Sequence, residues 1–153
     1  MKALETRIPP LVLVLIFAAA MFALARVLPT FGFVVPARLP LAVAVASAGV
    51  LAAMLGVLSF RRARTTVNPL QPEAASSLVA VGIYRVSRNP MYLGFLMLLA
   101  GWALWLANAA AFALLPLFVL YMNAYQIVPE ERALAARFGS AFSDYCRSVR
   151  RWL

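Results

Sequence analysis

Residues 89–129 form the longest uncharged stretch of the chain, 41 residues without Lys, Arg, Asp or Glu. A helix that crosses the hydrocarbon core of a bilayer needs about 20 predominantly apolar residues, so this stretch is long enough for two crossings. It predicts a helical hairpin of two spans, about residues 89–107 and 110–128, with Asn108 at the turn. The composition agrees, because 65% of the 153 residues are apolar and only 12% are charged, too few to cover a soluble domain of this size.

Two further uncharged runs predict spans at about residues 8–28 and 39–60. The chain is therefore expected to be a single all-α integral membrane domain, residues 1–153, with four transmembrane helices and an amphipathic C-terminal helix. The second of these runs carries small residues at helical spacing, which let two helices approach closely in lipid. These small residues are Gly49, Ala52, Ala53 and Gly56.

Twelve of the fourteen basic residues fall on one side of this four-span arrangement, and only Arg26 and Arg38 fall on the other. Cytoplasmic loops are enriched in Lys and Arg, so both termini are expected in the cytoplasm, with a bacterial inner membrane as the location. The formal charge of +9 lies at the ends of apolar runs, which favours anionic lipid headgroups over nucleic acid as a partner. The twelve are Lys2, Arg7, Arg61, Arg62, Arg64, Arg85, Arg88, Arg132, Arg137, Arg147, Arg150 and Arg151.

An amphipathic cytoplasmic helix is predicted after the last span. Pro129 suits the first position of a helix, and Glu130 and Glu131 suit its first turn. Apolar residues then recur every three or four positions, so the helix is expected to lie at the interface or to fold back over the bundle. They are Leu134, Phe138, Phe142, Tyr145, Val149 and Trp152.

The residue types that the chain lacks exclude several functions. There is no His and only one Cys, Cys146, so a metal cluster, a disulfide and a Ser-His or Cys-His nucleophile are not expected. A proton-coupled exporter needs an ionisable residue within a span, and all five acids lie outside the predicted spans. A small four-helix transporter or an assembly protein remains the alternative from another class.

Polar and aromatic residues gather where the chain leads into the third span, in residues 76–94. Pro90 has no backbone N–H and disfavours helix at Asn89, so we expect irregular backbone there. At membrane depth such backbone persists only where it is buried in protein or lines a wet cavity. A simple helix start is the alternative interpretation.

Three groups of residues stand in a fixed order in the C-terminal half: Gly82 and Tyr84; then Arg88, Asn89, Pro90, Met91, Tyr92 and Gly94; then Glu130, Glu131, Leu134, Phe138, Gly139, Tyr145 and Arg150. Their order and spacing resemble the C-terminal signature of the isoprenylcysteine carboxyl methyltransferase and phospholipid methyltransferase families. The resemblance covers about half of the chain, roughly residues 76–152.

The resemblance implies a pocket for S-adenosylmethionine, with S-adenosylhomocysteine as its product, between the last two spans and under the C-terminal tail. A physical reading agrees, because Glu130 can accept hydrogen bonds from ribose hydroxyls or an ammonium, and Tyr84 and Tyr92 can pack on adenine or the sulfonium. Helix-terminal charge is the structural alternative for Glu130. The cofactor residues that the resemblance implies are Ser76, Ser77, Leu78, Val79, Tyr84, Asn89, Pro90, Met91, Tyr92 and Glu130.

The acceptor is expected to be lipid-like, and its reacting atom is left open between oxygen, nitrogen and sulfur. The prenylcysteine enzymes usually carry His where this chain has Asn89, and Arg where it has Gln126. Gln126 lies four residues before Glu130, and with Arg88 it is predicted to contact the acceptor. Without a cation at Gln126, burying a free carboxylate would be unfavourable, so a neutral or amine-bearing acceptor is expected. A prenylcysteine carboxyl methyltransferase, or a catalytically silent relative, is the alternative.

Overall fold

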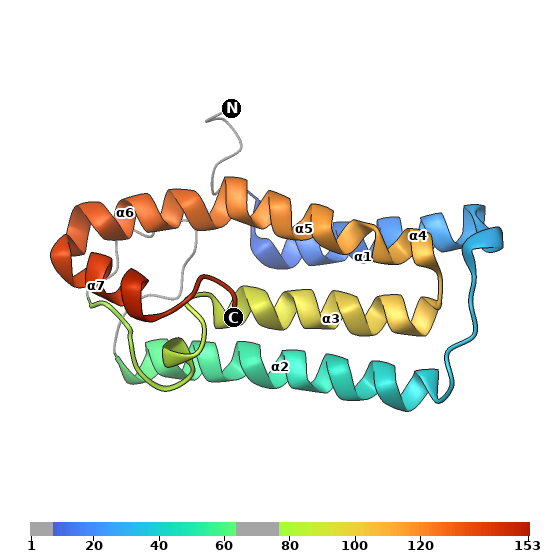
Figure 1. The fold of residues 1–153 in the computed structure, drawn as a ribbon, viewed down its shortest axis with the longest axis horizontal. Helices are drawn as coiled ribbons and strands as arrows, with labels where there is room; N and C mark the ends of the chain where they lie inside the picture. The colour runs from blue at the N-terminus through green and yellow to red at the C-terminus, as the bar shows by residue number, and fades with distance from the viewer. Residues whose placement is uncertain (1–7, 64–76) are drawn as a thin grey trace.

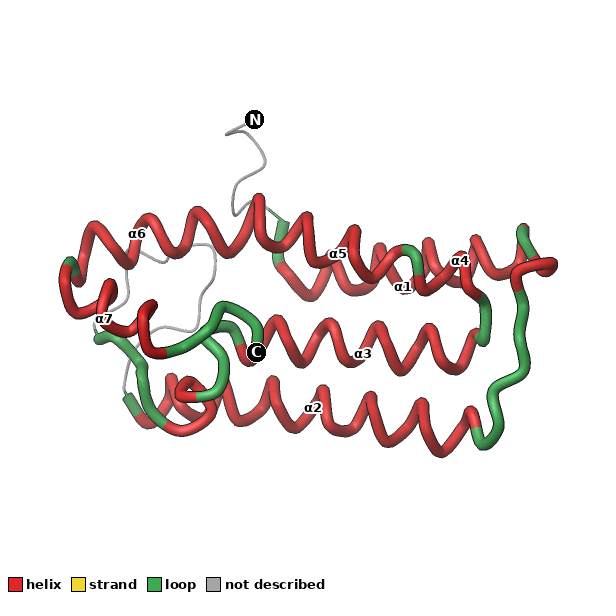
Figure 2. Tube along the Cα trace, in the orientation of Figure 1, coloured by secondary structure: helices red, strands yellow, loops and turns green. Residues whose placement is uncertain are grey.

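The computed structural model describes residues 8–63 and 77–153, and this part of the chain is helical, with one isolated bridge between Gly32 and Asn108. Figure 1 shows long helices lying side by side, and Figure 2 shows the loops at the two ends of the bundle. The elements are α1 (Pro10–Val27), η2 (Pro29–Phe31), α2 (Arg38–Arg62), η4 (Gly82–Arg85), α3 (Pro90–Leu106), α4 (Ala109–Phe112), α5 (Leu114–Met122), the π-helix η5 (Asn123–Ile127), α6 (Val128–Phe138) and α7 (Ser140–Ser148).

Three helices within the described residues are long and apolar enough to cross a membrane: α1, α2 and the continuous helix Ala109–Phe138, which comprises α4, α5, η5 and α6. The remaining apolar helix, α3, has 17 residues. Large apolar side chains cover the outside of the bundle, and Leu15 and Leu120 remain 64% and 63% exposed. Such a surface is favourable only next to lipid or another apolar partner, so the all-helical membrane fold expected from the sequence is supported.

The helix α3 packs against α2 on one side and against α1 and α5 on the other (Figure 1). Met21 of α1, Leu99 of α3 and Phe118 of α5 are at most 1% exposed and form the centre of the core. The indole N–H of Trp102 donates to the carbonyl of Ala18 at 3.0 Å and ties α3 to α1. Contacts with α1, α2 and α5 therefore fix the position of α3 in the bundle.

Small residues bring α2 and α3 into close contact, as the spacing in the second uncharged run predicts. A Cβ atom added at Gly49 would lie 2.6 Å from the carbonyl oxygen of Gly94, and one added at Gly56 would lie 2.6 Å from Cγ of Met91. Any larger side chain at Gly49 would therefore push the two backbones apart.

The predicted hairpin turn after α3 is confirmed. Ala107 adopts a left-handed conformation with φ of 50° and ends α3. Asn108 is buried, and its side chain accepts from the N–H of Ala110 at 2.9 Å and donates to the carbonyl of Leu28 at 2.9 Å. The amide therefore begins the next helix and also binds the end of α1.

The helix expected from Pro129 onward starts as predicted, because α6 has Pro129 in its first positions and Glu130 and Glu131 in its first turn. It is not separate from the last span, because the helix Ala109–Phe138 runs through Pro129 without a break. The preceding π-helix η5 accommodates the missing N–H of Pro129, since such turns rearrange the hydrogen bonding locally. The expected helix also ends early, because Gly139 has a φ of +51° and turns the chain into α7.

Candidate functional site

The polar segment before α3 forms an irregular path, as Pro90 predicts. The short helix η4 begins at Gly82, which has a φ of +61°. Asn89 has a φ of −130° and a ψ of 56°, outside the helical region, and Pro90 occupies the first turn of α3. The hydroxyl of Ser87, a fully buried residue, accepts from the N–H of Asn89 at 3.1 Å. The backbone is therefore held by local hydrogen bonds just before the helix begins.

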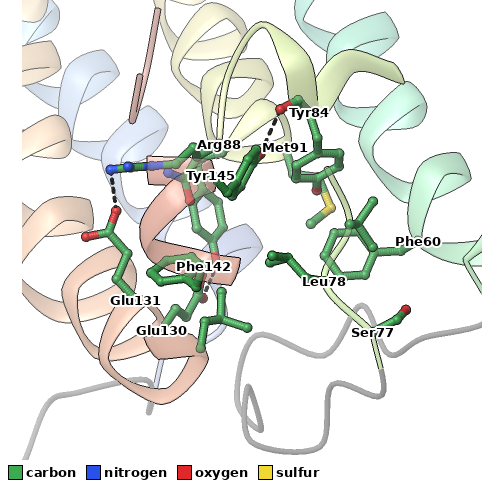
Figure 3. A pocket seen from close by; sticks show the side chains of 14 residues that line it. Phe60, Ser77, Leu78, Tyr84, Arg88, Met91, Glu130, Glu131, Phe142 and Tyr145 are labelled. Atoms are coloured by element: carbon green, nitrogen blue, oxygen red, sulfur yellow. Dashed lines mark hydrogen bonds and ion pairs between the residues drawn. The ribbon is translucent and has the colours of Figure 1, made fainter. Parts of the chain in front are cut away.

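A pocket lies at this end of the bundle, where η4, the start of α3, α6 and α7 meet (Figure 3). One wall is aromatic and aliphatic, and charged side chains reach it from α6 and from the residue before Asn89. The lining residues are Phe60, Ser77, Leu78, Val79, Tyr84, Arg88, Asn89, Met91, Tyr92, Glu130, Glu131, Leu134, Phe142 and Tyr145.

The structure brings most of the predicted cofactor residues together in this pocket, although they come from segments up to 53 positions apart. Those that line it are Ser77, Leu78, Val79, Tyr84, Asn89, Met91, Tyr92 and Glu130, and Arg88, predicted for the acceptor, joins them. Pro90 is buried at the start of α3 and does not line the pocket. Ser76 lies outside the described residues.

Gln126 does not line the pocket. Its side chain is fully buried, and its Nε2 donates to the carbonyl of Ile8 at 2.8 Å, at the start of the first span. The spacing argument failed because Gln126 lies in the π-helix η5. Bonding from i to i+5 puts more residues into a turn than an α-helix has, so a four-residue separation from Glu130 does not guarantee a shared face.

Five lining residues were not among the predicted site residues. Phe60, at the end of α2, packs edge-to-face on Tyr84 with ring centroids 5.3 Å apart. Glu131 and Leu134 lie on α6 and Phe142 and Tyr145 on α7. Except for Phe60, these residues stood in the sequence motifs or in the apolar stripe. The stripe predicted the burial of Leu134, Phe142 and Tyr145, and the turn at Gly139 directs Phe142 and Tyr145 of α7 toward the pocket.

Two tyrosines fix the aromatic wall. The hydroxyl of Tyr145 donates to the backbone carbonyl of Tyr84 at 2.7 Å, and both residues are at most 8% exposed. Burial raises the pKa of both hydroxyls well above the usual value, and the nearby Tyr145 raises that of Tyr84 further. The two hydroxyls therefore stay protonated, and that of Tyr145 remains a hydrogen-bond donor at neutral pH.

The polar side of the pocket is built from Arg88, Tyr92 and two carboxylates. The hydroxyl of Tyr92 donates to Glu130, and the Arg88 guanidinium pairs with Glu131 at 2.8 Å. A second guanidinium nitrogen of Arg88 donates to the carbonyl of Cys146 at 3.2 Å. Its Nε is buried without a partner among the described residues. The lining thus carries two carboxylates, one guanidinium and one donor that a ligand can satisfy.

No group of three metal-binding side chains occurs among the described residues.

The fold and the pocket define a helical membrane protein with a polar and aromatic site at one end of its bundle. The family model described as phospholipid methyltransferase matches residues 37–141, more than half of the chain, so the chain belongs to that family of membrane methyltransferases. This confirms the resemblance that the motifs indicated.

A relative from Haemophilus influenzae, described as an uncharacterized protein, is 43% identical over 63 residues. These residues are 41% of this chain and the whole of the relative. No solved structure matches the chain significantly.

Proposed function

We propose that this protein transfers a methyl group from S-adenosylmethionine to a lipid-like acceptor. The observation that carries the proposal is the meeting of Asn89 and Tyr92 at the start of α3 with Glu130 of α6 in one pocket. The motifs implied these residues as cofactor contacts, and membership of a methyltransferase family supports the same chemistry.

The residues of the pocket suit the chemical parts of this cofactor. Phe60, Leu78 and Phe142 offer apolar and aromatic surface for adenine. The carboxylate of Glu130 can accept hydrogen bonds from ribose hydroxyls or an ammonium, and the unpartnered Nε of Arg88 can donate to a carboxylate.

The cofactor supplies a methyl group that is already activated on a sulfonium. The protein therefore has to orient two reactants and exclude water, an effect worth about 7–11 kcal/mol at best. Buried Tyr84 and Tyr92 form the dry side of the pocket. The Tyr92 hydrogen bond to Glu130 would hold that carboxylate in place beside a bound cofactor. No covalent enzyme intermediate is required, which suits a site without an obvious nucleophile.

A second, shallow groove on the outside of α2 and α3 supports a lipid-like acceptor. It is apolar apart from Arg61, and Met91 lines both this groove and the pocket. An acyl chain in the groove would place its headgroup near Arg61 and its reacting atom near Met91. The groove residues are Ala53, Met54, Val57, Leu58, Arg61, Met91 and Phe95.

The charge of the pocket favours a neutral or amine-bearing acceptor. The reason first drawn from Gln126 fails, because that side chain is directed to Ile8. A different reason takes its place: the guanidinium groups of Arg88 and Arg151 both already pair with Glu131. A free prenylcysteine carboxylate would compete with Glu131 for these cations and would lie near Glu130, and this disfavours it.

We propose that the protein has four spans, and that α3, the third in chain order, is one of them. Its 17 residues are at the lower limit for crossing a bilayer, and its close packing on α2 allows it to cross beside a longer neighbour. We propose a bacterial inner membrane location with both termini in the cytoplasm, on the basis of the basic residues. A reporter enzyme that works only in the cytoplasm should be active when it is fused after Leu153. Activity of a reporter that works only in the periplasm would reject this orientation.

The function is tested by offering methyl-labelled S-adenosylmethionine to the purified protein with phosphatidylethanolamine or with a prenylated cysteine in micelles. We expect label in the amine lipid. Efficient esterification of the prenylcysteine alone would identify a prenylcysteine methyltransferase and reject our choice of acceptor. If cofactor binds but no acceptor is methylated, a catalytically silent member is supported instead, and a transporter would bind no cofactor.

A further inference from the structure

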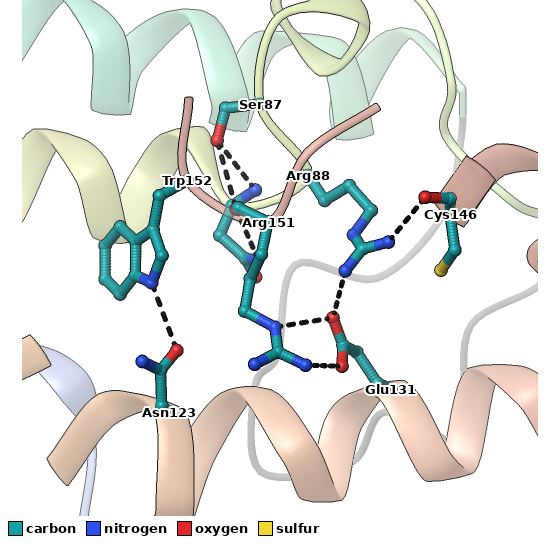
Figure 4. A network of polar contacts seen from close by, with 8 residues as sticks. Ser87, Arg88, Asn123, Glu131, Cys146, Arg151 and Trp152 are labelled. Carbon is teal, nitrogen blue, oxygen red and sulfur yellow. Dashed lines mark hydrogen bonds and ion pairs between the residues drawn. The ribbon is translucent and has the colours of Figure 1, made fainter. Parts of the chain in front are cut away.

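Residues 150–152, which follow α7 and which we call the C-terminal strap, lie against the chain just before α3 (Figure 4). The carbonyl of Arg150 accepts from the backbone N–H of Arg88 at 3.0 Å. The carbonyl of Arg151 accepts from Nδ2 of Asn89 at 3.0 Å and from the hydroxyl of Ser87 at 3.4 Å. The strap therefore binds three consecutive residues at the start of the pocket wall.

The same strap also binds the opposite helix. The guanidinium of Arg151 donates to both carboxylate oxygens of Glu131 on α6, from Nε at 3.1 Å and from Nη2 at 2.6 Å. The indole N–H of Trp152 donates to the side-chain oxygen of Asn123 in η5 at 3.0 Å. Arg151 thus contacts Asn89 through its backbone carbonyl and Glu131 through its guanidinium, without lining the pocket itself.

The contacts of Arg151 affect the orientation of those two side chains more than the stability of the fold. Its side chain is 36% exposed and that of Glu131 is 20% exposed, and pairs that retain contact with water stabilise proteins only weakly. The two-pronged geometry nevertheless fixes the plane of the carboxylate. The bond from Asn89 uses one amide hydrogen and leaves its carbonyl oxygen to accept from another group.

We propose that Arg151 is a positioning residue for the cofactor pocket. Its guanidinium holds the Glu131 carboxylate, together with the Arg88 guanidinium that Glu131 binds, in the orientation that a bound cofactor needs. The bond from Asn89 goes to the backbone carbonyl of Arg151 and remains when the side chain is substituted. This inference rests on the proposed function, because it assigns the pocket to the cofactor.

The test compares Arg151→Met and Arg151→Lys with Arg147→Met in detergent-purified full-length protein. Arg147 is a matched control, because it is an exposed arginine on α7 paired with Asp144 and lies away from the pocket lining. Calorimetric titration with S-adenosylhomocysteine and thermal unfolding are measured for each variant, and KM is measured for cofactor and acceptor separately.

We expect Arg151→Met to raise the Kd and the cofactor KM about tenfold, the equivalent of one lost charge-assisted contact. Arg151→Lys should lie between it and the wild type, since Lys keeps the charge without the planar fork. The acceptor KM should not change, and Arg147→Met should bind as the wild type does.

The proposal is wrong if Arg151→Met binds with wild-type affinity, or if cofactor and acceptor KM rise together with a large fall in Tm. Should Arg151→Met not fold, Arg151→Lys decides alone: unchanged affinity in that variant would reject the bidentate role. A wild-type protein that binds no S-adenosylhomocysteine would overturn the proposed function and this inference with it, whereas normal wild-type binding with an insensitive Arg151 rejects only the positioning role.

Discussion

The hydroxyl of Tyr92, in the first turn of α3, donates a hydrogen bond to the carboxylate of Glu130, 38 positions later on α6. Both residues line the pocket. The bond joins two elements that the hairpin turn at Asn108 brings back to the same end of the bundle. A change at either residue should therefore affect the same ligand.

Glu130→Ala should weaken binding of S-adenosylhomocysteine more than Glu131→Ala does. One oxygen of Glu130 accepts from Tyr92 and the other can turn to a ligand, whereas both oxygens of Glu131 are engaged by Arg88 and Arg151. A lost hydrogen bond to a charged group is worth roughly 1.5–3 kcal/mol. Calorimetry measures the Kd of both variants. Equal and negligible effects would show that Glu130 and Glu131 act only as charges at the start of a helix.

Tyr92→Phe should retain more cofactor affinity than Tyr92→Ala. Phe keeps the buried ring and loses only the bond to the Glu130 carboxylate, roughly 1.5–3 kcal/mol for a hydrogen bond to a charged group. Ala also removes the ring surface, a loss of about 3–5 kcal/mol in packing alone. The comparison is made by titration with S-adenosylhomocysteine, alongside thermal unfolding. Equal loss of binding in the two variants would show that the hydroxyl, and not the ring, is what matters.

Gly49→Ala should destabilise the bundle more than Gly56→Ala. The new methyl at Gly49 would meet the backbone carbonyl of Gly94, which cannot move without shifting α3. At Gly56 it would meet Cγ of Met91, which belongs to a flexible side chain. Overpacking of this kind costs about 1–3 kcal/mol. Thermal unfolding in one detergent measures the difference. A Gly49→Ala protein as stable as the wild type would mean that α2 and α3 pack less closely than described.

Tyr145→Phe should destabilise the fold by about 1–3 kcal/mol, because the carbonyl of Tyr84 loses its buried donor. Ser143→Ala, on an exposed face of the same helix, is the control and should change little.

Burial raises the pKa of Tyr145 in the folded state above the value of about 10 for an exposed tyrosine. Ionisation therefore favours the unfolded chain, and this contribution to stability is present at neutral pH and falls as pH rises beyond about 10. Chemical unfolding of the two variants across pH tests this; a control that behaves like Tyr145→Phe would contradict it.

The spans and the hairpin turn could be predicted because an uncharged apolar run of about 20 residues is typical of a membrane-spanning helix, and a run of twice that length is typical of two. Asn108 could also be predicted, since a polar residue in the middle of 41 uncharged residues marks a bend. Among the described residues, three helices have the length of a span, whereas α3, with 17 residues, is shorter than the segment of residues 89–107 predicted for it. Pro129 stands in the first positions of α6 as predicted, but the π-helix η5 joins α6 to the preceding span without a break, and local sequence rules do not foresee that continuation.

The lining residues that belong to the sequence motifs could be predicted. Most of the implied cofactor residues meet there, since the order of motifs reflects one shared arrangement of helices. Gln126 was misplaced because its assignment assumed regular α-helical spacing across η5. Phe60 could not be found from sequence, because its position depends on how α2 and η4 pack, and Arg151 was counted only as a basic residue that orients the chain.

Titration of S-adenosylhomocysteine into the folded, detergent-purified protein tests the central claim most directly. We predict saturable binding to one site with a Kd in the micromolar range, an order of magnitude taken from ordinary substrate levels, and a clear loss of affinity in Glu130→Ala. A protein with normal thermal unfolding that releases no heat of binding, at cofactor concentrations up to about a millimolar, would contradict the assignment of this pocket to a methyl donor.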